Sequence, residues 1–166
     1  MEKTIIDFSS SDEQKRWEII NDAVMGGVSE SRIALADNKA ALFQGIVSLE
    51  NYGGFASMRT HPREFELSGC SGLMIRVKGD GKDYRLRLGT DSDYEGIAYQ
   101  AHFSTEQDQW ITARLSFDAF TPVFRGRVIK DAPPLDITAV RRIGFMIADE
   151  QEGPFRLEIE WVKAYS

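Results

Sequence analysis

The chain has 166 residues, of which 42% are hydrophobic and 28% charged; this balance is typical of a globular protein, and we expect a single domain over residues 1–166. The net charge of −6 argues against a general nucleic-acid binder, which needs a basic surface to displace counterions from phosphates. It also disfavours adhesion to anionic membranes, and no stretch approaches the roughly eighteen apolar residues of a membrane span.

Apolar and polar residues alternate with a period of two along most of the chain, which predicts half-buried β-strands. Strands are expected at Thr4–Phe8, Ala41–Leu49, Phe55–Thr60, Leu73–Val77, Tyr84–Leu88, Tyr99–Phe103, Ile111–Leu115, Val140–Ala148 and Phe155–Tyr165. Only Ser11–Ile20 has a faintly helical pattern. About nine short strands with almost no helix predict an all-β protein, a two-sheet β-sandwich of jelly-roll type. We expect Trp17, Trp161 and most phenylalanines in its core.

Two connections between these strands have informative sequences. K-G-D-G-K at Lys78–Lys82 predicts a tight hairpin between the strands that flank it. The longest irregular stretch, Thr121–Thr138, contains Arg125 and Arg127, and loops of this length are more often functional than accidental. Arg125 and Arg127 belong either to a basic surface turn or to an ordered loop that contacts an acidic partner.

Two glycine pairs each lie beside an asparagine and an acidic residue. Asn21 and Asp22 precede Gly26–Gly27, and Glu50 and Asn51 precede Gly53–Gly54. Paired glycines allow backbone angles closed to other residues and let a second segment approach closely. One hypothesis is a structural loop packed over one end of the sandwich; the other is a loop that faces a ligand or partner.

Several segments occur in one order along the chain: N-D-A-V-M-G-G-V-S from Asn21, V-S-L-E-N-Y-G-G-F-A-S-M-R from Val47, G-D-G from Gly79, R-G-R from Arg125, I-G-F from Ile143 and G-P-F from Gly153. Taken together, the chain resembles the complex I intermediate-associated protein 30 family from about Trp17 to Trp161. The resemblance implies a galactose-binding-like β-sandwich. For mitochondrial members of the family, it implies a role in assembling respiratory complex I.

A polar strand face is the second candidate site. If the apolar residues of each strand face the core, one set of side chains faces outward: Arg76, Arg85, Arg87, Gln100, His102, Trp110, Thr112 and Arg114. We predict that Arg76, Arg85 and Arg87 lie side by side on one sheet and contact a ligand or partner, since guanidinium groups suit carboxylates and sugar hydroxyls. The alternatives are a solvated face paired with Asp91, Asp93 or Glu95, and strands divided between opposite sheets.

Catalytic and metal sites have little support in the sequence. His61 and His102 form no zinc-binding pair, no G-x-S-x-G elbow is present, and no cofactor or catalytic metal is expected. A structural Ca²⁺ near Asp91 and Asp93 is a minor hypothesis. The single cysteine, Cys70, excludes an internal disulfide and is interpreted as a structural thiol.

These observations predict a non-enzymatic binding module or assembly factor that acts on a protein partner. The alternative is a carbohydrate-binding module that uses the arginine-bearing face and Trp110; an unrecognised enzyme ranks third. We expect neither nucleic-acid binding nor membrane insertion. The first residues, M-E-K-T-I-I-D-F, match neither a secretory signal nor a mitochondrial transit peptide, which predicts a cytoplasmic protein.

Overall fold

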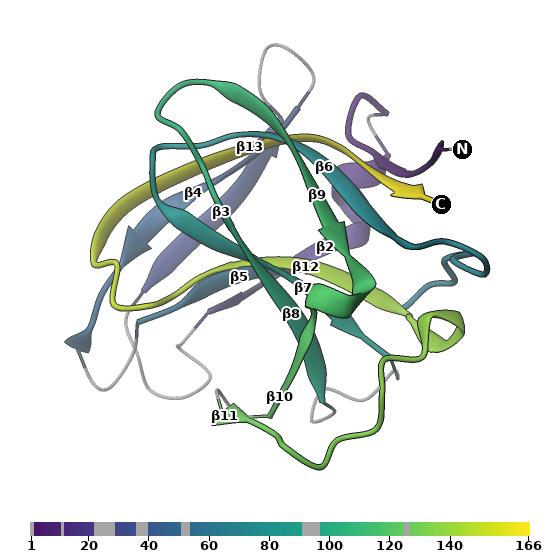
Figure 1. Cartoon of the computed structure of the whole chain (residues 1–166). Coiled ribbons are helices and arrows are strands. Elements are labelled where there is room, and N and C mark those ends of the chain that lie inside the picture. The colour runs from purple at the N-terminus through teal and green to yellow at the C-terminus, as the bar shows by residue number, and fades with distance from the viewer. Residues whose placement is uncertain are drawn as a thin grey trace.

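Two β-sheets face each other across an apolar core (Figure 1). The computed structural model describes residues 2–10, 12–21, 29–35, 40–50, 54–90, 97–124 and 127–166. All pairings between its named strands are antiparallel. The predicted all-β, two-sheet sandwich of jelly-roll type is confirmed.

The first sheet, sheet A, has the strand order β3–β4–β13–β6–β9, and β1 also pairs with β13. Its strands are β1 (Glu2–Asp7), β3 (Glu30–Leu35), β4 (Ala41–Val47), β6 (Gly72–Lys78), β9 (Trp110–Ser116) and β13 (Gly153–Tyr165). The second sheet, sheet B, has the order β11–β10–β8–β7–β12–β5–β2. Its strands are β2 (Trp17–Asn21), β5 (Ala56–Thr60), β7 (Asp83–Gly89), β8 (Ala98–Ser104), β10 (Thr121–Phe124), β11 (Arg127–Val128) and β12 (Arg142–Ile147).

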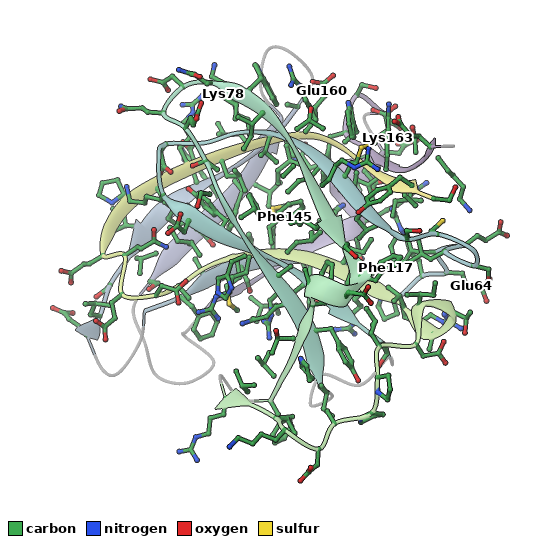
Figure 2. The ribbon with its side chains drawn as sticks, in the orientation of Figure 1. Glu64, Lys78, Phe117, Phe145, Glu160 and Lys163 are labelled. Atoms are coloured by element: carbon green, nitrogen blue, oxygen red, sulfur yellow. The ribbon has the colours of Figure 1, made fainter. Side chains whose placement is uncertain are left out.

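The core lies between the sheets and is built by the predicted alternation. Leu73, Ile75 and Val77 of β6 are fully buried, as are Tyr84, Leu86 and Leu88 of β7. Phe145 of β12 points into this space and packs against Trp17 and Phe103 (Figure 2). Burial of this apolar surface is the main stabilising term for the sandwich.

Trp161 is a correction to the predicted core. A register shift interrupts the pairing of β13 with β6 between Ile159 and Trp161, so Ile159 and Val162 are buried while Trp161 faces outward. Trp161 is half-buried, and the ammonium of Lys163 lies 4.2 Å from its ring centre. Alternation alone cannot place a residue next to such a bulge.

The helical interpretation of Ser11–Ile20 is wrong beyond one short turn. Glu13–Arg16 form a 3-10 helix, and the chain then extends as β2. Glu13 is buried there because its carboxylate accepts hydrogen bonds from Trp17 Nε1 at 3.1 Å and from Arg63 Nη1 at 2.8 Å. This buried ion pair fixes the turn, and no pattern of apolar residues could predict it. Within the described segments, no helix is long and apolar enough to cross a membrane.

The stretch Thr121–Thr138 is more ordered than predicted. It contains β10, which pairs with β8, and the short β11, which pairs with β10. Ile137–Ala139 form a 3-10 helix capped by the Asp136 side chain, which accepts from Thr138 N at 3.0 Å. Arg125 lies outside the described residues, whereas Arg127 is exposed on β11.

The predicted hairpin at Lys78–Lys82 is also wrong, because the chain crosses from sheet A to sheet B there. Gly79 forms a bridge with Gln107, and a Cβ atom on Gly79 would lie 2.3 Å from Thr105 Cβ. The close approach of Thr105 therefore requires glycine at this position. The same turn residues can connect two strands of one sheet or pass between two sheets, so the G-D-G sequence does not decide between them.

Gly54 has the backbone conformation expected of a glycine-pair loop, with φ of 126°. Gly26, Gly27 and Gly53 lie outside the described residues. We expect Gly54→Ala to lower the free energy of unfolding by about 1–3 kcal/mol, since an added Cβ would be strained at this φ and 3.2 Å from Leu49 Cδ2. Urea denaturation measures the change. In the control, Gly89→Ala, the Cβ would make an ordinary contact at 3.5 Å; equal midpoints for the two variants would contradict the prediction.

Candidate functional site

The predicted arginine face is divided between the two sheets. Arg85 and Arg87 on β7 lie beside His102 and Gln100 on β8, on the outer face of sheet B. Arg76 lies instead on β6, beside Thr112 and Trp161, on the outer face of sheet A. The prediction that Arg76 adjoins Arg85 and Arg87 is therefore wrong, because the chain changes sheets at Gly79–Gly81.

Trp110 and Arg114 also lie on the outer face of sheet A. The Arg76 guanidinium lies 5.7 Å from the Trp110 ring centre, and the Arg114 guanidinium lies 4.1 Å from the Tyr165 ring centre. Arg76 Nη1 also donates to Thr112 Oγ1 at 3.2 Å. Arg76 and Arg114 of sheet A therefore each interact with a neighbouring aromatic ring.

The remaining predicted site residues are scattered or lie outside the described chain. Asp22 and Asn51 are among the residues not described, and only the backbone of Asn21 is described, at the end of β2. Glu50 is exposed, and its N–H donates to Ser48 Oγ at 3.2 Å. No hydrogen bond or ion pair within the described ranges joins Glu50 or Arg127 to the arginines of sheet B.

The outer face of sheet B carries a row of polar residues across its strands, which we call the sheet B face. Strand register places Arg59 of β5 beside Gly144 of β12, and Gly144 beside Arg87. The whole row runs Glu18, Arg59, Gly144, Arg87, Gln100, Thr121, with Arg85, His102 and Arg142 in the adjoining rows. A Cβ on Gly144 would lie 2.7 Å from the Met58 carbonyl oxygen and 3.1 Å from Arg59 Cβ. Only glycine fits between the two arginines without distortion.

Sequence reasoning missed Arg59 and Gly144 as parts of this face. The signal for Arg59 was present, because it alternates with the buried Met58 in the A-S-M-R segment. Gly144 lies within the I-G-F segment that carried the family resemblance. Which strands adjoin across the sheet was the missing information, and alternation does not supply it.

Two of these arginines have acidic partners. Arg59 Nε donates to Glu18 Oε1 at 2.9 Å, and Arg85 Nη2 donates to Asp149 Oδ1. The imidazoles of His61 and His102 lie 3.5 and 3.9 Å from the carboxylates of Glu18 and Asp149, respectively. Paired arginines of this kind are common at protein surfaces and indicate no ligand by themselves.

Arg87 differs from its neighbours. No hydrogen bond or ion pair to its guanidinium is found within the described ranges of the chain, whereas Arg59 and Arg85 each have an acidic partner. Its Nε, like those of Arg85 and Arg142, is buried without an acceptor there. Burial, followed by repulsion from Arg85 and Arg59, lowers the pKa of Arg87 to about 10. At neutral pH the group is therefore still charged, and it lies half-buried between two other cations.

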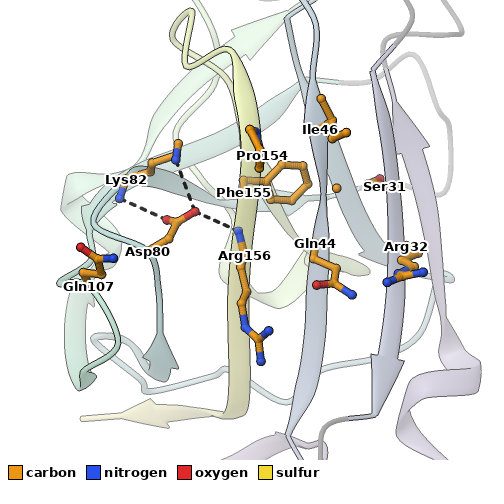
Figure 3. A pocket seen from close by; sticks show the side chains of 11 residues that line it. Ser31, Arg32, Gln44, Ile46, Asp80, Lys82, Gln107, Pro154, Phe155 and Arg156 are labelled. Carbon is orange, nitrogen blue, oxygen red and sulfur yellow. Dashed lines mark hydrogen bonds and ion pairs between the residues drawn. The ribbon is translucent and has the colours of Figure 1, made fainter.

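The groove at the β3–β4–β13 side of sheet A contains a further charged group, Asp80, and has a volume of about 680 Å³ (Figure 3). Asp80 Oδ1 accepts from Tyr84 Oη at 2.9 Å and from Lys82 N at 3.2 Å, while Oδ2 accepts from Arg156 N at 2.9 Å. The Lys82 ammonium lies 3.6 Å away. These internal contacts occupy the carboxylate, so the G-D-G segment fastens β6, β7 and β13 together.

Within the described ranges, no group of three or more His, Cys, Asp or Glu side chains could hold a metal ion. Asp91, Asp93 and Glu95 lie outside those ranges. The chemistry that the sheet B face can perform is recognition. A planar guanidinium without a counter-ion binds a carboxylate through two parallel hydrogen bonds.

Comparison with known proteins agrees with the earlier resemblance. The family model described as complex I intermediate-associated protein 30 matches residues 6–159. The chain is similar to the protein named complex I intermediate-associated protein 30, mitochondrial, of Mus musculus, with 24% identity over 99% of this chain and 56% of the mouse protein. The Drosophila melanogaster protein of the same name is 27% identical over 95% of this chain and 61% of its own length. The chain thus spans little more than half of these relatives.

Solved structures with similar folds include carbohydrate-binding modules. The family 11 module of Clostridium thermocellum, in complex with a β-1,3-1,4-mixed-linked tetrasaccharide, superimposes with a TM-score of 0.74 at 15% identity; 99% of this chain and 95% of that chain are covered. A mutant of a family 29 carbohydrate-binding module superimposes with a TM-score of 0.56 at 13% identity and covers 99% of this chain and 84% of that one. At these identities the likeness establishes the fold alone.

Proposed function

We propose that this chain, which belongs to the complex I intermediate-associated protein 30 family, is a non-enzymatic binding module that acts on a protein partner as an assembly factor. The observation that carries the proposal is the sheet B face, where Arg87 keeps its charge without a counter-ion within the described ranges. The names of the relatives make an intermediate of respiratory complex I the first partner to test.

A polar recognition face suits this role better than a catalytic site does. Arg59, Arg85 and Arg87 come from two strands of one rigid sheet, so their positions need little ordering when a partner binds. Arginine is enriched among the residues that dominate protein–protein binding energy. The chain as a whole carries a charge of −6, so this cationic face marks a local departure from its overall field.

Carbohydrate binding is the second candidate, and a specific observation favours it on sheet A. Trp110 and Trp161 are both half-buried on the outer face of sheet A; Arg76 pairs with Trp161 in the strand register, and Trp110 pairs with Lys78, two residues further along β6. Exposed aromatic rings can stack on sugar faces. However, the cations that lie over both rings occupy part of that stacking surface.

One pair of matched variants separates the two functions. We expect Arg85→Ala with Arg87→Ala to abolish recovery of the partner from native lysate, because both changes fall on the sheet B face. Arg76→Ala with Arg114→Ala removes the same charge from sheet A and is expected to leave recovery unchanged. A glycan array probed with both variants completes the test. Glycan binding lost only in the sheet A variant, with no protein recovered by any form, would support the carbohydrate candidate instead.

A further inference from the structure

Arg87 lies in the middle of the sheet B face, with Arg85 on its own strand and Arg59 two strands away. Gly144 has no side chain and lies between Arg59 and Arg87 in the register of three neighbouring strands. Neighbouring strands lie about 4.8 Å apart, so the two arginines start roughly 10 Å from each other across the glycine. The row therefore has no side chain at Gly144, and we call this position between Arg87 and Arg59 the gap.

The charges around this gap favour an anion. Glu18 neutralises Arg59 on one side, and Asp149 neutralises Arg85 on the other, whereas Arg87 has no acid within the described ranges. Arg85 and Arg87 lie two residues apart on one face of β7, with Arg59 across Gly144, and repulsion from both neighbours contributes to the lowered pKa of Arg87. A half-buried cation among cations is unfavourable until an anion approaches it.

We propose that Arg87 anchors a carboxylate of an acidic segment of the protein partner, which enters above Gly144 between Arg87 and Arg59. This inference rests on the proposed function for its choice of a protein as the ligand. The guanidinium of Arg87 supplies a planar fork that matches both carboxylate oxygens. Arg59 contributes a second positive charge from the far side of the glycine.

The surrounding acids restrict what can bind. Glu18 and Asp149 border the gap at opposite sides, and the chain carries a net charge of −6. A long polyanion such as a nucleic acid would lie against these acids and be repelled. A short segment with isolated carboxylates can place one of them above Gly144 while its other residues avoid repulsion from Glu18 and Asp149.

The test uses the whole chain, isotope-labelled for NMR, titrated with a Gly-Ser-Glu repeat peptide and with its Gly-Ser-Gln counterpart. We expect the glutamate peptide to shift the amide signals of Arg59, Arg87 and Gly144, and the glutamine peptide to leave them in place. Arg87→Gln is expected to weaken binding at least about tenfold, because a desolvated charge pair is lost. Arg114→Gln, the same change on sheet A, is expected to keep the wild-type affinity.

The peptide titration overturns the inference if the two peptides bind equally, if the affinity is unchanged in Arg87→Gln, or if the shifts are confined to sheet A. A galacturonate oligosaccharide that binds more tightly than the glutamate peptide would also overturn it, because the carboxylate would then belong to a sugar. The proposed function fails separately. If no protein is recovered from lysate through the sheet B face but the glutamate peptide binds at Arg87, the proposed function is contradicted and the anion site is still supported. If a partner is recovered equally well by wild type and Arg87→Gln, the role of Arg87 as an anchor is contradicted and the proposed function is still supported.

Discussion

Replacing Asp80 with alanine is expected to lower the free energy of unfolding by about 2–4 kcal/mol. The carboxylate accepts hydrogen bonds from Tyr84, Lys82 and Arg156, and Tyr84 is fully buried. Burial and the neighbouring Asp80 charge raise the pKa of Tyr84, so this hydroxyl stays protonated and needs an acceptor. Tyr84 Oη also lies 3.2 Å from the Arg156 carbonyl oxygen, a second acceptor that reduces the destabilisation.

Chemical denaturation measures this change, and Asp83→Ala is its control. Asp83 is an exposed acid three residues away, and its removal is expected to shift stability by no more than about 0.5 kcal/mol. A midpoint for Asp80→Ala equal to that of the control would refute the fastening role of the G-D-G segment. It would return Asp80 to consideration as a ligand group of the groove in Figure 3.

Arg87→Met is expected to raise the free energy of unfolding by about 1–3 kcal/mol while it removes partner binding. The pKa of Arg87 is lowered in the folded state, so both folded and unfolded chains hold this proton at neutral pH and the folded chain bears the cost of the charge. Methionine fills a similar volume without that charge. The melting temperature should rise by about 2–4 °C per kcal/mol for a chain of this size.

The pH dependence of this gain has a definite sign. As pH rises through about 10, the folded wild type releases the Arg87 proton before the unfolded chain does, and its stability increases. The difference between Arg87→Met and wild type should therefore narrow above that pH. Arg114→Met, which removes an exposed arginine from sheet A, is expected to change the melting temperature little at either pH. A lower melting temperature for Arg87→Met at neutral pH would show that Arg87 stabilises the fold.

The fold was predictable because apolar alternation is a local property. The strands around Leu73–Val77, Tyr84–Leu88 and Tyr99–Phe103 are confirmed within one or two residues at each end. β2 and β3 were missed because Trp17–Asn21 and Glu30–Leu35 do not alternate cleanly. The turn before β2 depends on the pairing of Glu13 with Arg63, which lies 50 residues away.

The candidate site was predictable only in part, because it depends on which strands adjoin. The outward direction of Arg85, Arg87, Gln100 and His102 followed from alternation, and their neighbourhood followed from the β7–β8 pairing. The separation of Arg76 from them depends on a crossing between sheets at Gly79, which turn residues do not specify. Arg59 and Gly144 adjoin Arg87 through β5 and β12, strands that are far from β7 in the sequence.

Site-specific photo-crosslinking in living cells tests most directly whether a partner binds through the sheet B face. A benzoylphenylalanine replaces Thr121, which is exposed at the end of the polar row on β10, or Thr112, which is exposed on β9 of sheet A. We predict a defined crosslinked protein from position Thr121 that disappears when Arg87→Gln is added, and none from position Thr112. A crosslinked protein from Thr112 alone would contradict this account, whereas one from Thr121 that persists at full yield with Arg87→Gln would contradict only the role of Arg87 as the anchor.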